Sequence, residues 1–231
     1  MRMTDESPLP SLPSLPSLPS RFVQVIASPS ALFDVLRQRP AWGGAVLLGA
    51  LLLLLGAGLT PPELLLNTMR ERLLERGQVL PPGLEDRLGM IRVGGAVGAS
   101  VAWVIMMGLS AGLVTVVFGL LLGHGGTMRQ YLAVVSHAHL IAAASVVFIL
   151  PLRMATQDAQ VLLSLGSFAF FLEEGYLLRM LSLVDLFGLW AWMLVGLGVS
   201  RVGRKDTWVG AAMFLLLIPF AKAAVIAFFT A

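Results

Sequence analysis

The chain has 231 residues, of which 57% are hydrophobic and only 13% are charged, and its mean hydropathy is +0.86. Such a chain has too little polar surface to coat a water-soluble globule, so the composition predicts a membrane protein. The absence of cysteine excludes disulfides and thiolate chemistry, and the net charge of +3 comes from scattered arginines, which argues against a nucleic-acid partner.

The first 20 residues contain the repeat LPSLPSLPSLPS, whose three-residue period matches polyproline II. This composition cannot bury a core, so we interpret residues 1–20 as a disordered tail. Docking of the repeated leucines on an aromatic groove is the alternative.

Residues 21–40 are predicted to form an interfacial, amphipathic entry helix. The apolar side chains recur at intervals of three and four residues, which places them on one helical stripe. Ser28 and Pro29 are typical of a helix cap and a first turn, and Arg37 and Arg39 follow near the end. An apolar stripe that ends in basic residues suits a membrane surface.

Five apolar runs are long enough to cross a hydrocarbon layer of about 30 Å, which takes roughly 20 helical residues. The predicted spans are 41–59, 93–122, 131–152, 181–199 and 208–231. The fold class is therefore an all-α polytopic bundle of five transmembrane helices, in one domain covering residues 41–231. The second run would be about 45 Å long as one helix, so we expect it to tilt, bend near Gly108 and Gly112, or leave the bilayer.

Two connecting segments are predicted to lie at the membrane surface. Residues 62–76 form an interfacial helix with a charged face. Residues 159–172 are apolar but too short to span, so they are interfacial or re-entrant. Glu173 and Glu174 follow, and we favour a solvated edge over a cation site there. The basic loop at 201–205 favours a cytoplasmic N-terminus and an external C-terminus.

The three histidines lie within the stretch GHGGTMRQYLAVVSHAH. His137 and His139 are two residues apart, so on a helix their side chains diverge by about 200 degrees and cannot hold one ion. Neither a metal nor another cofactor is expected. Gly125 and Gly126 instead predict a tight hairpin turn, and Arg129 marks the inner interface.

The sequence GLSAG at 108–112 matches the G-x-S-x-G pattern of serine hydrolases. With His137 or His139 on the next span, Ser110 could belong to an intramembrane hydrolase. A nucleophile elbow needs a strand-to-helix turn or a helix start, whereas Ser110 lies inside an apolar run. We favour the other interpretation, small-xxx-small helix packing, which pairs Gly94 with Gly98 and Gly108 with Gly112.

Asp185 and Lys222 are ionisable residues within predicted spans, where charge is costly and usually has a partner. Counting from the inner ends places both at equal depth on adjacent antiparallel helices. We predict an ion pair between them that orients the two spans. A proton or ion pathway is the alternative, although it would need further charges.

Three stretches resemble the Ypt-interacting protein (Yip) domain family. They are RFVQVIASPSALFDVLRQRP with Pro29, Phe33, Leu36 and Pro40, GGTMRQYLAVVSHAH with Gly125, Gly126, Arg129, Gln130 and Leu132, and VDLFGLWAWMLVGLGVSRV with Asp185, Phe187, Trp190, Leu194 and Gly198. The resemblance implies a prokaryotic five-span protein of the inner membrane with a cytoplasmic N-terminus. It does not imply the Rab GTPase partner of the eukaryotic relatives, because the acidic Leu-Tyr-Gly-Pro motif before span one is absent.

These features favour a non-enzymatic integral membrane protein that organises membrane or serves as a scaffold for other membrane proteins. Its expected partners are the lipid bilayer and either other membrane proteins or a second copy of the chain. The alternative is a small transporter, or an intramembrane serine hydrolase that uses Ser110 with His137 or His139.

Overall fold

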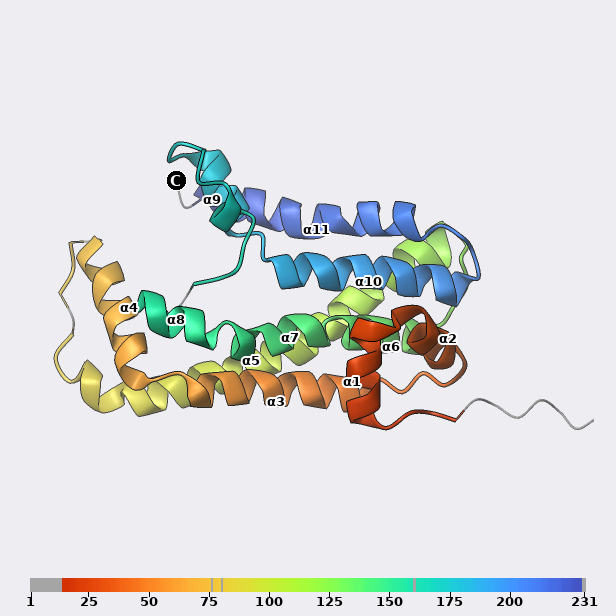
Figure 1. Cartoon of the computed structure of the whole chain (residues 1–231), viewed down its shortest axis with the longest axis horizontal. Coiled ribbons are helices and arrows are strands. Elements are labelled where there is room, and N and C mark those ends of the chain that lie inside the picture. Colours follow the sequence, from red (N-terminus) through yellow and green to blue (C-terminus); the bar gives the residue numbers. More distant parts are fainter. Residues whose placement is uncertain (1–13, 76, 80, 160, 230–231) are drawn as a thin grey trace, which may run out of the picture.

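The computed structural model describes residues 14–75, 77–79, 81–159 and 161–229, and its architecture is all-α (Figure 1). The long helices run side by side along one axis, and shorter helices lie at the two ends of the bundle. Within the described residues, the β-structure is one isolated bridge between Ser164 and Asp185. The predicted fold class is confirmed.

Four helical segments are long and apolar enough to cross a membrane. They are Leu84–Leu121, Met128–Thr156, Leu186–Gly203 (α10) and Trp208–Phe229 (α11). Helix α3 (Gly43–Leu59) followed by α4 (Pro62–Glu75) passes the same test as a pair, bent by 83°, and would be the fifth. The chain is thus a multi-pass membrane protein with four or five crossing helices.

Helix α3 has 17 residues, so it rises about 25 Å, the lower end of what a crossing helix needs. It lies alongside α5 (Leu84–Val114) and α7 (Leu140–Phe148). Gly49 allows close contact with Trp103 of α5, whose indole donates a hydrogen bond to the Val46 carbonyl at 3.2 Å. These contacts pack α3 against α5 and α7 within the bundle.

The central span consists of α6 (Met128–Ala138), α7 and α8 (Leu150–Thr156). Between residues 131 and 141 every residue except Leu132 is buried. The most apolar part of this span is 72% buried, against 28% for the span formed by α5 and 22% for α11. Most of the surface of α5 and α11 is therefore available to lipid or to other proteins.

The entry segment differs from the prediction in two respects. It forms two helices, α1 (Leu18–Ala27) and α2 (Pro29–Gln38), which meet at Ser28. Its apolar stripe packs into the bundle core, because Leu32, Phe33 and Leu36 are fully buried. The apolar stripe of the predicted entry helix at 21–40 therefore faces the bundle core, since such a stripe can face a protein core as readily as a membrane, and the position of the segment at a membrane surface stays a prediction.

Several predicted boundaries shift. The second span begins at Leu84 instead of residue 93 and, instead of bending at Gly108 or Gly112, ends in a π-helix, η1 (Thr115–Leu121). Helix α10 starts at Leu186 instead of residue 181. Of the predicted tail at 1–20, residues 1–13 lie outside the described residues, and helix α1 has already begun at Leu18. Residue 76, the predicted end of the helix at 62–76, and residues 230 and 231 of the last predicted span also lie outside them.

The segment predicted as interfacial or re-entrant, 159–172, is mainly loop at one end of the bundle, with a short 3-10 helix, η2 (Gly166–Phe168). Backbone hydrogen bonds from Leu165 to Val184 and from Leu186 to Leu163, both 3.0 Å, hold it beside the start of α10. Helix α9 (Tyr176–Ser182) follows, and the Tyr176 hydroxyl donates to the Ala224 carbonyl of α11 at 3.1 Å.

Candidate functional site

The glycines of the spans fall into two groups according to the space around them. A side chain at Gly196 would collide with the backbone of Ala212 on α11, with the Cβ only 2.5 Å from its Cα. A Cβ added at Gly198 would likewise collide with the side chain of Val134 on α6, and one added at Gly56 with that of Val146 on α7. These glycines are required for helix packing within the chain, because any larger residue would separate the helices.

The glycines predicted to pack helices, those of α5, have no such neighbour. A Cβ added at Gly94, Gly98, Gly108 or Gly112 would meet nothing within 4 Å. At 3.6 residues per turn the four positions fall within about 80° of one another around the helix axis. The same face carries Val101 and Ile105, which are 54% and 55% exposed. We call these six residues the open face of α5.

The opposite side of α5 is buried and includes Ser110, which is 7% exposed. Within the described residues, Ser110 makes no hydrogen bond with His137 or His139. Both ring nitrogens of His137 have other partners. The structure therefore does not assemble the nucleophile and base that the hydrolase alternative requires.

His137 is fully buried and pairs with Arg21. Its Nδ1 lies 2.8 Å from the Ala133 carbonyl, so this nitrogen must carry the proton, and Nε2 is left to accept a hydrogen bond from Arg21 Nη1 at 3.2 Å. The same Nη1 donates to the Ala41 carbonyl at 3.1 Å. Burial lowers the pKa of the Arg21 guanidinium, which still remains charged at neutral pH. The cluster ties α1 and the start of α3 to the central span.

The other histidines are apart from this cluster. His139 Nδ1 bonds to the Val135 carbonyl at 3.0 Å, and the ring packs edge-on against Trp192. His124 lies in the hairpin loop and packs against Phe118, and burial, followed by the charge of Lys205, lowers its pKa. The described residues include no group of three side chains that could hold a metal ion.

The glycine hairpin joins three elements at one end of the molecule. Gly125 and Gly126 have φ angles of +70° and +89°, a region that favours glycine. The Gly125 carbonyl accepts from the Tyr131 hydroxyl at 2.6 Å, and Thr127 forms a capping box with Gln130. The Gln130 side chain also donates to the Arg37 carbonyl at the end of α2, at 2.7 Å. Arg129 is exposed beside it.

Asp185 does not form the predicted ion pair. No nitrogen of Lys222 lies within 4.0 Å of its carboxylate, and the described salt bridges are Arg70 with Glu85 and Arg201 with Asp34. Asp185 instead caps α10 by accepting a hydrogen bond from the Gly188 backbone at 2.6 Å. Burial raises the pKa of this carboxyl, while the backbone hydrogen bonds and, least, the charge of Lys222 oppose the rise. Helix α10 begins at Leu186, so Asp185 lies at the helix end and outside the span.

Phe187 and Trp190, which follow Asp185 in the sequence, are also among the positions that carry the resemblance to the Yip domain family. Phe187 is half-buried and packs against the core, whereas Trp190 is 39% exposed on the outer side of α10. Lys222 is exposed on α11, one turn after Pro219 within the helix. None of these residues forms a polar cluster with the others.

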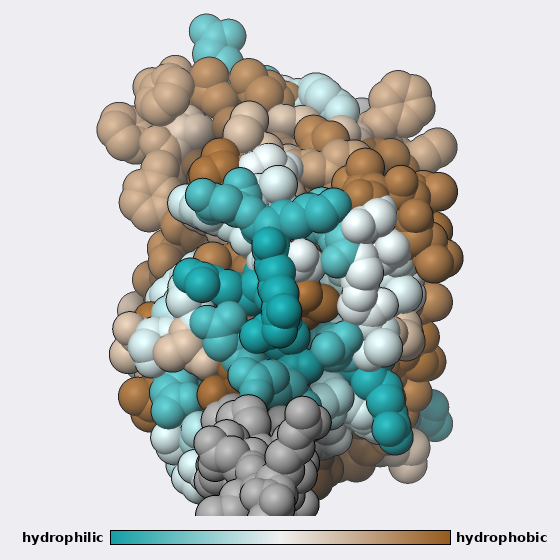
Figure 2. All heavy atoms as spheres, turned by 90° about the vertical axis from the view of Figure 1, so that its right-hand side faces the viewer, coloured by the Kyte–Doolittle hydropathy of each residue, from teal (hydrophilic) through white to brown (hydrophobic). Residues whose placement is uncertain are grey.

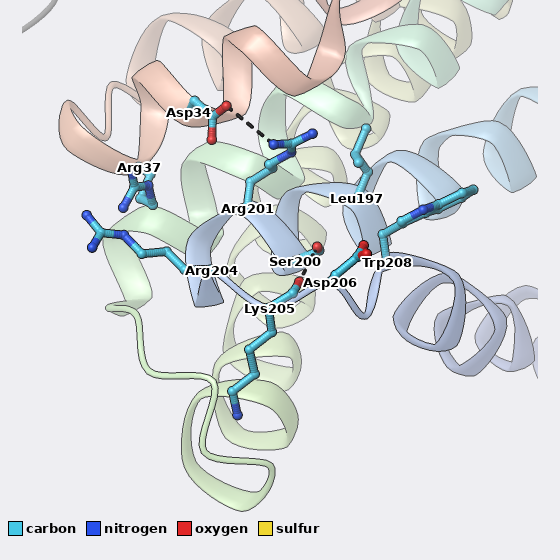
Figure 3. Close-up of a pocket in the computed structure, with 9 residues that line it drawn as sticks. All are labelled: Asp34, Arg37, Leu197, Ser200, Arg201, Arg204, Lys205, Asp206 and Trp208. Atoms are coloured by element: carbon cyan, nitrogen blue, oxygen red, sulfur yellow. Dashed lines mark hydrogen bonds and ion pairs between the residues drawn. The ribbon is translucent and has the colours of Figure 1, made fainter.

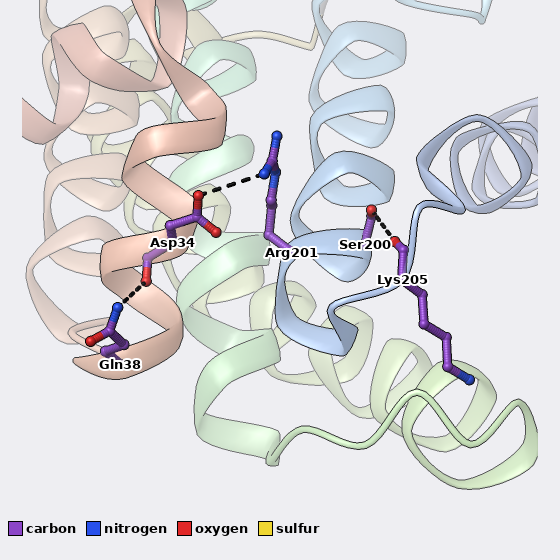
Figure 4. A network of polar contacts seen from close by, with 5 residues as sticks. All are labelled: Asp34, Gln38, Ser200, Arg201 and Lys205. Atoms are coloured by element: carbon purple, nitrogen blue, oxygen red, sulfur yellow. Dashed lines mark hydrogen bonds and ion pairs between the residues drawn. The ribbon is translucent and has the colours of Figure 1, made fainter.

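At the hairpin end, α2 and α10 are joined by polar contacts (Figure 4). Arg201 Nη1 lies 3.7 Å from Asp34 Oδ2, and Gln38 bonds to the Asp34 carbonyl within α2. Ser200 donates to the Lys205 carbonyl, which closes the turn after α10. Lys205 Nζ then donates to the Gly123 carbonyl at 3.1 Å. This end is therefore ordered by side chains from α2, the hairpin and α10.

The fold and these sites define a multi-pass integral membrane protein. The chain is 26% identical over 207 residues to "Membrane protein YknW" of Bacillus subtilis (strain 168), which covers 85% of this chain and 86% of that relative. No family model matches the chain, and no solved structure matches it. The similarity agrees with the assignment of the chain as a membrane protein.

Proposed function

We propose that the protein is a non-enzymatic scaffold that binds helices of other membrane proteins through the open face of α5. The observation that carries the proposal is the contrast between the two groups of glycines. Gly49 and Gly56 of α3 and Gly196 and Gly198 of α10 are packed against neighbouring helices, whereas Gly94, Gly98, Gly108 and Gly112 face open space.

The chemistry of the open face fits a transmembrane helix as the partner. In lipid, helices associate through close packing instead of the hydrophobic effect, so small residues that admit a second backbone are favoured at their contacts. Isolated glycines in a helix are otherwise unfavourable by about 0.5–1 kcal/mol each relative to alanine. A docked helix with small residues of its own would give the four glycines a structural use.

Two observations support a non-enzymatic role. Both ring nitrogens of His137 are engaged by Arg21 and by Ala133, and neither His137 nor His139 forms a hydrogen bond with Ser110 within the described residues. Asp185 and Lys222 do not pair, so the charges needed for a transport pathway are not gathered in the described part of the chain. A scaffold requires neither arrangement.

We further propose that the chain has the Yip domain arrangement. The positions that carry the resemblance have structural roles, which supports this. Pro29 begins α2, Gln130 joins α6 to α2, and Asp185 caps α10. Such residues would preserve an arrangement of helices while leaving the partner to be chosen by the exposed faces.

The test is quantitative mass spectrometry of the tagged full-length chain after crosslinking in its native membrane. Gly98→Leu fills the open face, and Gly210→Leu is the matched control, because Gly210 on α11 also faces open space. We expect heterologous membrane proteins to be recovered with the native chain and Gly210→Leu, and to be lost with Gly98→Leu.

Recovery of the same proteins with Gly98→Leu would exclude the open face as the docking site. Recovery of a second copy alone would overturn the scaffold for other proteins. A third variant, Ser110→Ala, addresses catalysis, since the accumulation of uncleaved substrates with this variant would contradict a non-enzymatic role.

A further inference from the structure

A basic cleft lies between α2, the end of α10 and the start of α11 (Figure 3). Its volume is about 450 Å³. It belongs to the hydrophilic end of the molecule, which Figure 2 shows framed by apolar surface. The lining includes four cationic side chains, Arg37, Arg201, Arg204 and Lys205, against two carboxylates, those of Asp34 and Asp206. The cleft therefore has an excess of positive charge.

Two of the four cations are already engaged within the protein. Arg201 lies 3.7 Å from Asp34, and the Lys205 ammonium points away from the cleft toward the carbonyls of Leu122 and Gly123. The remaining two, Arg37 and Arg204, have no ion-pair or hydrogen-bond partner for their guanidinium groups within the described residues. Both side chains line the cleft (Figure 3).

The Arg37 guanidinium shows the need for a partner most directly. Its Nε is buried and makes no hydrogen bond. A buried donor without an acceptor is unfavourable, and the four cations of the cleft outnumber its two carboxylates. A phosphate in the cleft would balance this excess charge, and guanidinium groups bind phosphate oxygens through paired hydrogen bonds.

The backbone at Arg204 is a separate observation that points the same way. Arg204 ends α10 with φ +51°, in the left-handed region where glycine is the favoured residue. An arginine there is unfavourable for the backbone, and nothing within the described fold uses its guanidinium. A ligand that binds this group would account for its presence.

The apolar part of the lining distinguishes a lipid from a free anion. Leu197 lies on α10 within the span, and Trp208 is the first residue of α11. Tryptophan is typical of the boundary between hydrocarbon and headgroups. A lipid could place its phosphate at the arginines while its chains follow Leu197 and Trp208, whereas inorganic phosphate would make no use of that wall.

We infer that the basic cleft binds the phosphate of an anionic lipid headgroup, with Arg37 and Arg204 as its ligands. This inference is independent of the proposed scaffold function, because the cleft and the open face of α5 share no residue. Loss of either one leaves the other testable.

The experiment is native mass spectrometry of the full-length chain released from micelles that contain equal amounts of phosphatidylglycerol and phosphatidylcholine. We expect phosphatidylglycerol to be retained preferentially. Arg204→Gly should weaken its retention by about tenfold, the effect of losing a charge-assisted hydrogen bond. The change should not harm the fold, because glycine suits this backbone conformation.

Arg129→Gln is the matched control, since it removes one charge from an exposed residue of α6 that does not line the cleft. It should retain phosphatidylglycerol like the native chain. Arg37→Gln provides a second cleft variant with the same expected loss as Arg204→Gly, which keeps the test decisive if one variant fails to fold.

Equal retention of phosphatidylglycerol by the native chain and by a folded cleft variant would overturn the inference. Inorganic phosphate provides the other arm. Millimolar phosphate should not displace the lipid, and displacement with the same dependence on Arg37 and Arg204 would assign the cleft to a soluble phosphate instead.

Discussion

At the residue scale, the buried contact of Arg21 with His137 joins two side chains that are 116 positions apart. Arg21 is only 7% exposed, although it directly follows the Leu-Pro-Ser repeat in the sequence. Its place four residues before the buried Val25 was a signal that it shares the inward face of a helix. Its partner could not be found from the sequence, because helical periodicity does not report contacts between remote helices.

His137→Phe should therefore lower the free energy of unfolding by about 1–3 kcal/mol, because the buried Arg21 would lose its acceptor. His137→Gln should lower it less, since the amide oxygen can accept the same hydrogen bond. His139→Phe is the control, because the Nδ1 contact of His139 stays within its own helix. Denaturant titrations in micelles, followed by tryptophan fluorescence, measure the differences. Equal losses for His137→Phe and His139→Phe would contradict the role of the pair.

At the element scale, the ends of the helices were harder to predict than their existence. The long apolar runs indicated the spans, because a stretch of about 20 apolar residues has few stable environments other than a bilayer. Counting depth along those runs placed Asp185 inside a span. In the local sequence Asp-Leu-Phe-Gly, the aspartate carboxylate can accept a hydrogen bond from the backbone N–H of the glycine three residues later. This cap starts α10 at Leu186.

The two accounts of Asp185 predict different mutant stabilities. Loss of the cap in Asp185→Ala should cost about 0.5–2 kcal/mol, whereas Asp185→Asn should cost little because asparagine is an equally good cap. Lys222→Met should change the free energy of unfolding by less than about 0.5 kcal/mol, as expected for an exposed residue without an ion pair. If Lys222→Met lowered the free energy of unfolding as much as Asp185→Ala, the result would contradict the cap alone and support the predicted ion pair.

The two groups of glycines also predict opposite effects of alanine. Gly196→Ala should lower the free energy of unfolding by about 1–3 kcal/mol, because the added methyl group would overpack the contact of α10 with Ala212 on α11. Gly98→Ala should leave it unchanged or raise it by up to about 1 kcal/mol, because alanine favours the helix. Thermal unfolding of both purified variants tests this, and destabilisation by Gly98→Ala would show that its surroundings are already packed.

At the scale of the whole molecule, composition was sufficient to predict a helical membrane bundle, but not how the entry segment is used. The stripe of Leu32, Phe33 and Leu36 has the same pattern whether it faces a membrane or a core. It packs against α6 and α10 because α2 lies across the end of those helices. Likewise, the open face of α5 could be predicted as a packing motif, whereas only the fold shows that no helix among the described residues occupies it.

The absence of cysteine makes the chain suited to single-cysteine mapping of its topology. If α3 crosses the membrane, cysteines at Gln38 and Asp206 should react with a membrane-impermeant maleimide from one side, and cysteines at Gln78 and Gln157 from the other. This pattern follows because α2 is joined to the end of α10 through Asp34 and Arg201. If the cysteines at positions 38 and 78 were labelled from the same side, α3 would not cross the membrane and the chain would have four spans.

The central claim is that the open face of α5 binds the helices of other membrane proteins. The most direct measurement is photocrosslinking in native membranes from a benzophenone side chain at Val101 or Ile105, compared with Met213 on α11, which is 66% exposed. The account predicts discrete crosslinks to other membrane proteins from the two α5 positions and none of these from Met213. Crosslinks to lipid alone from all three positions would contradict it.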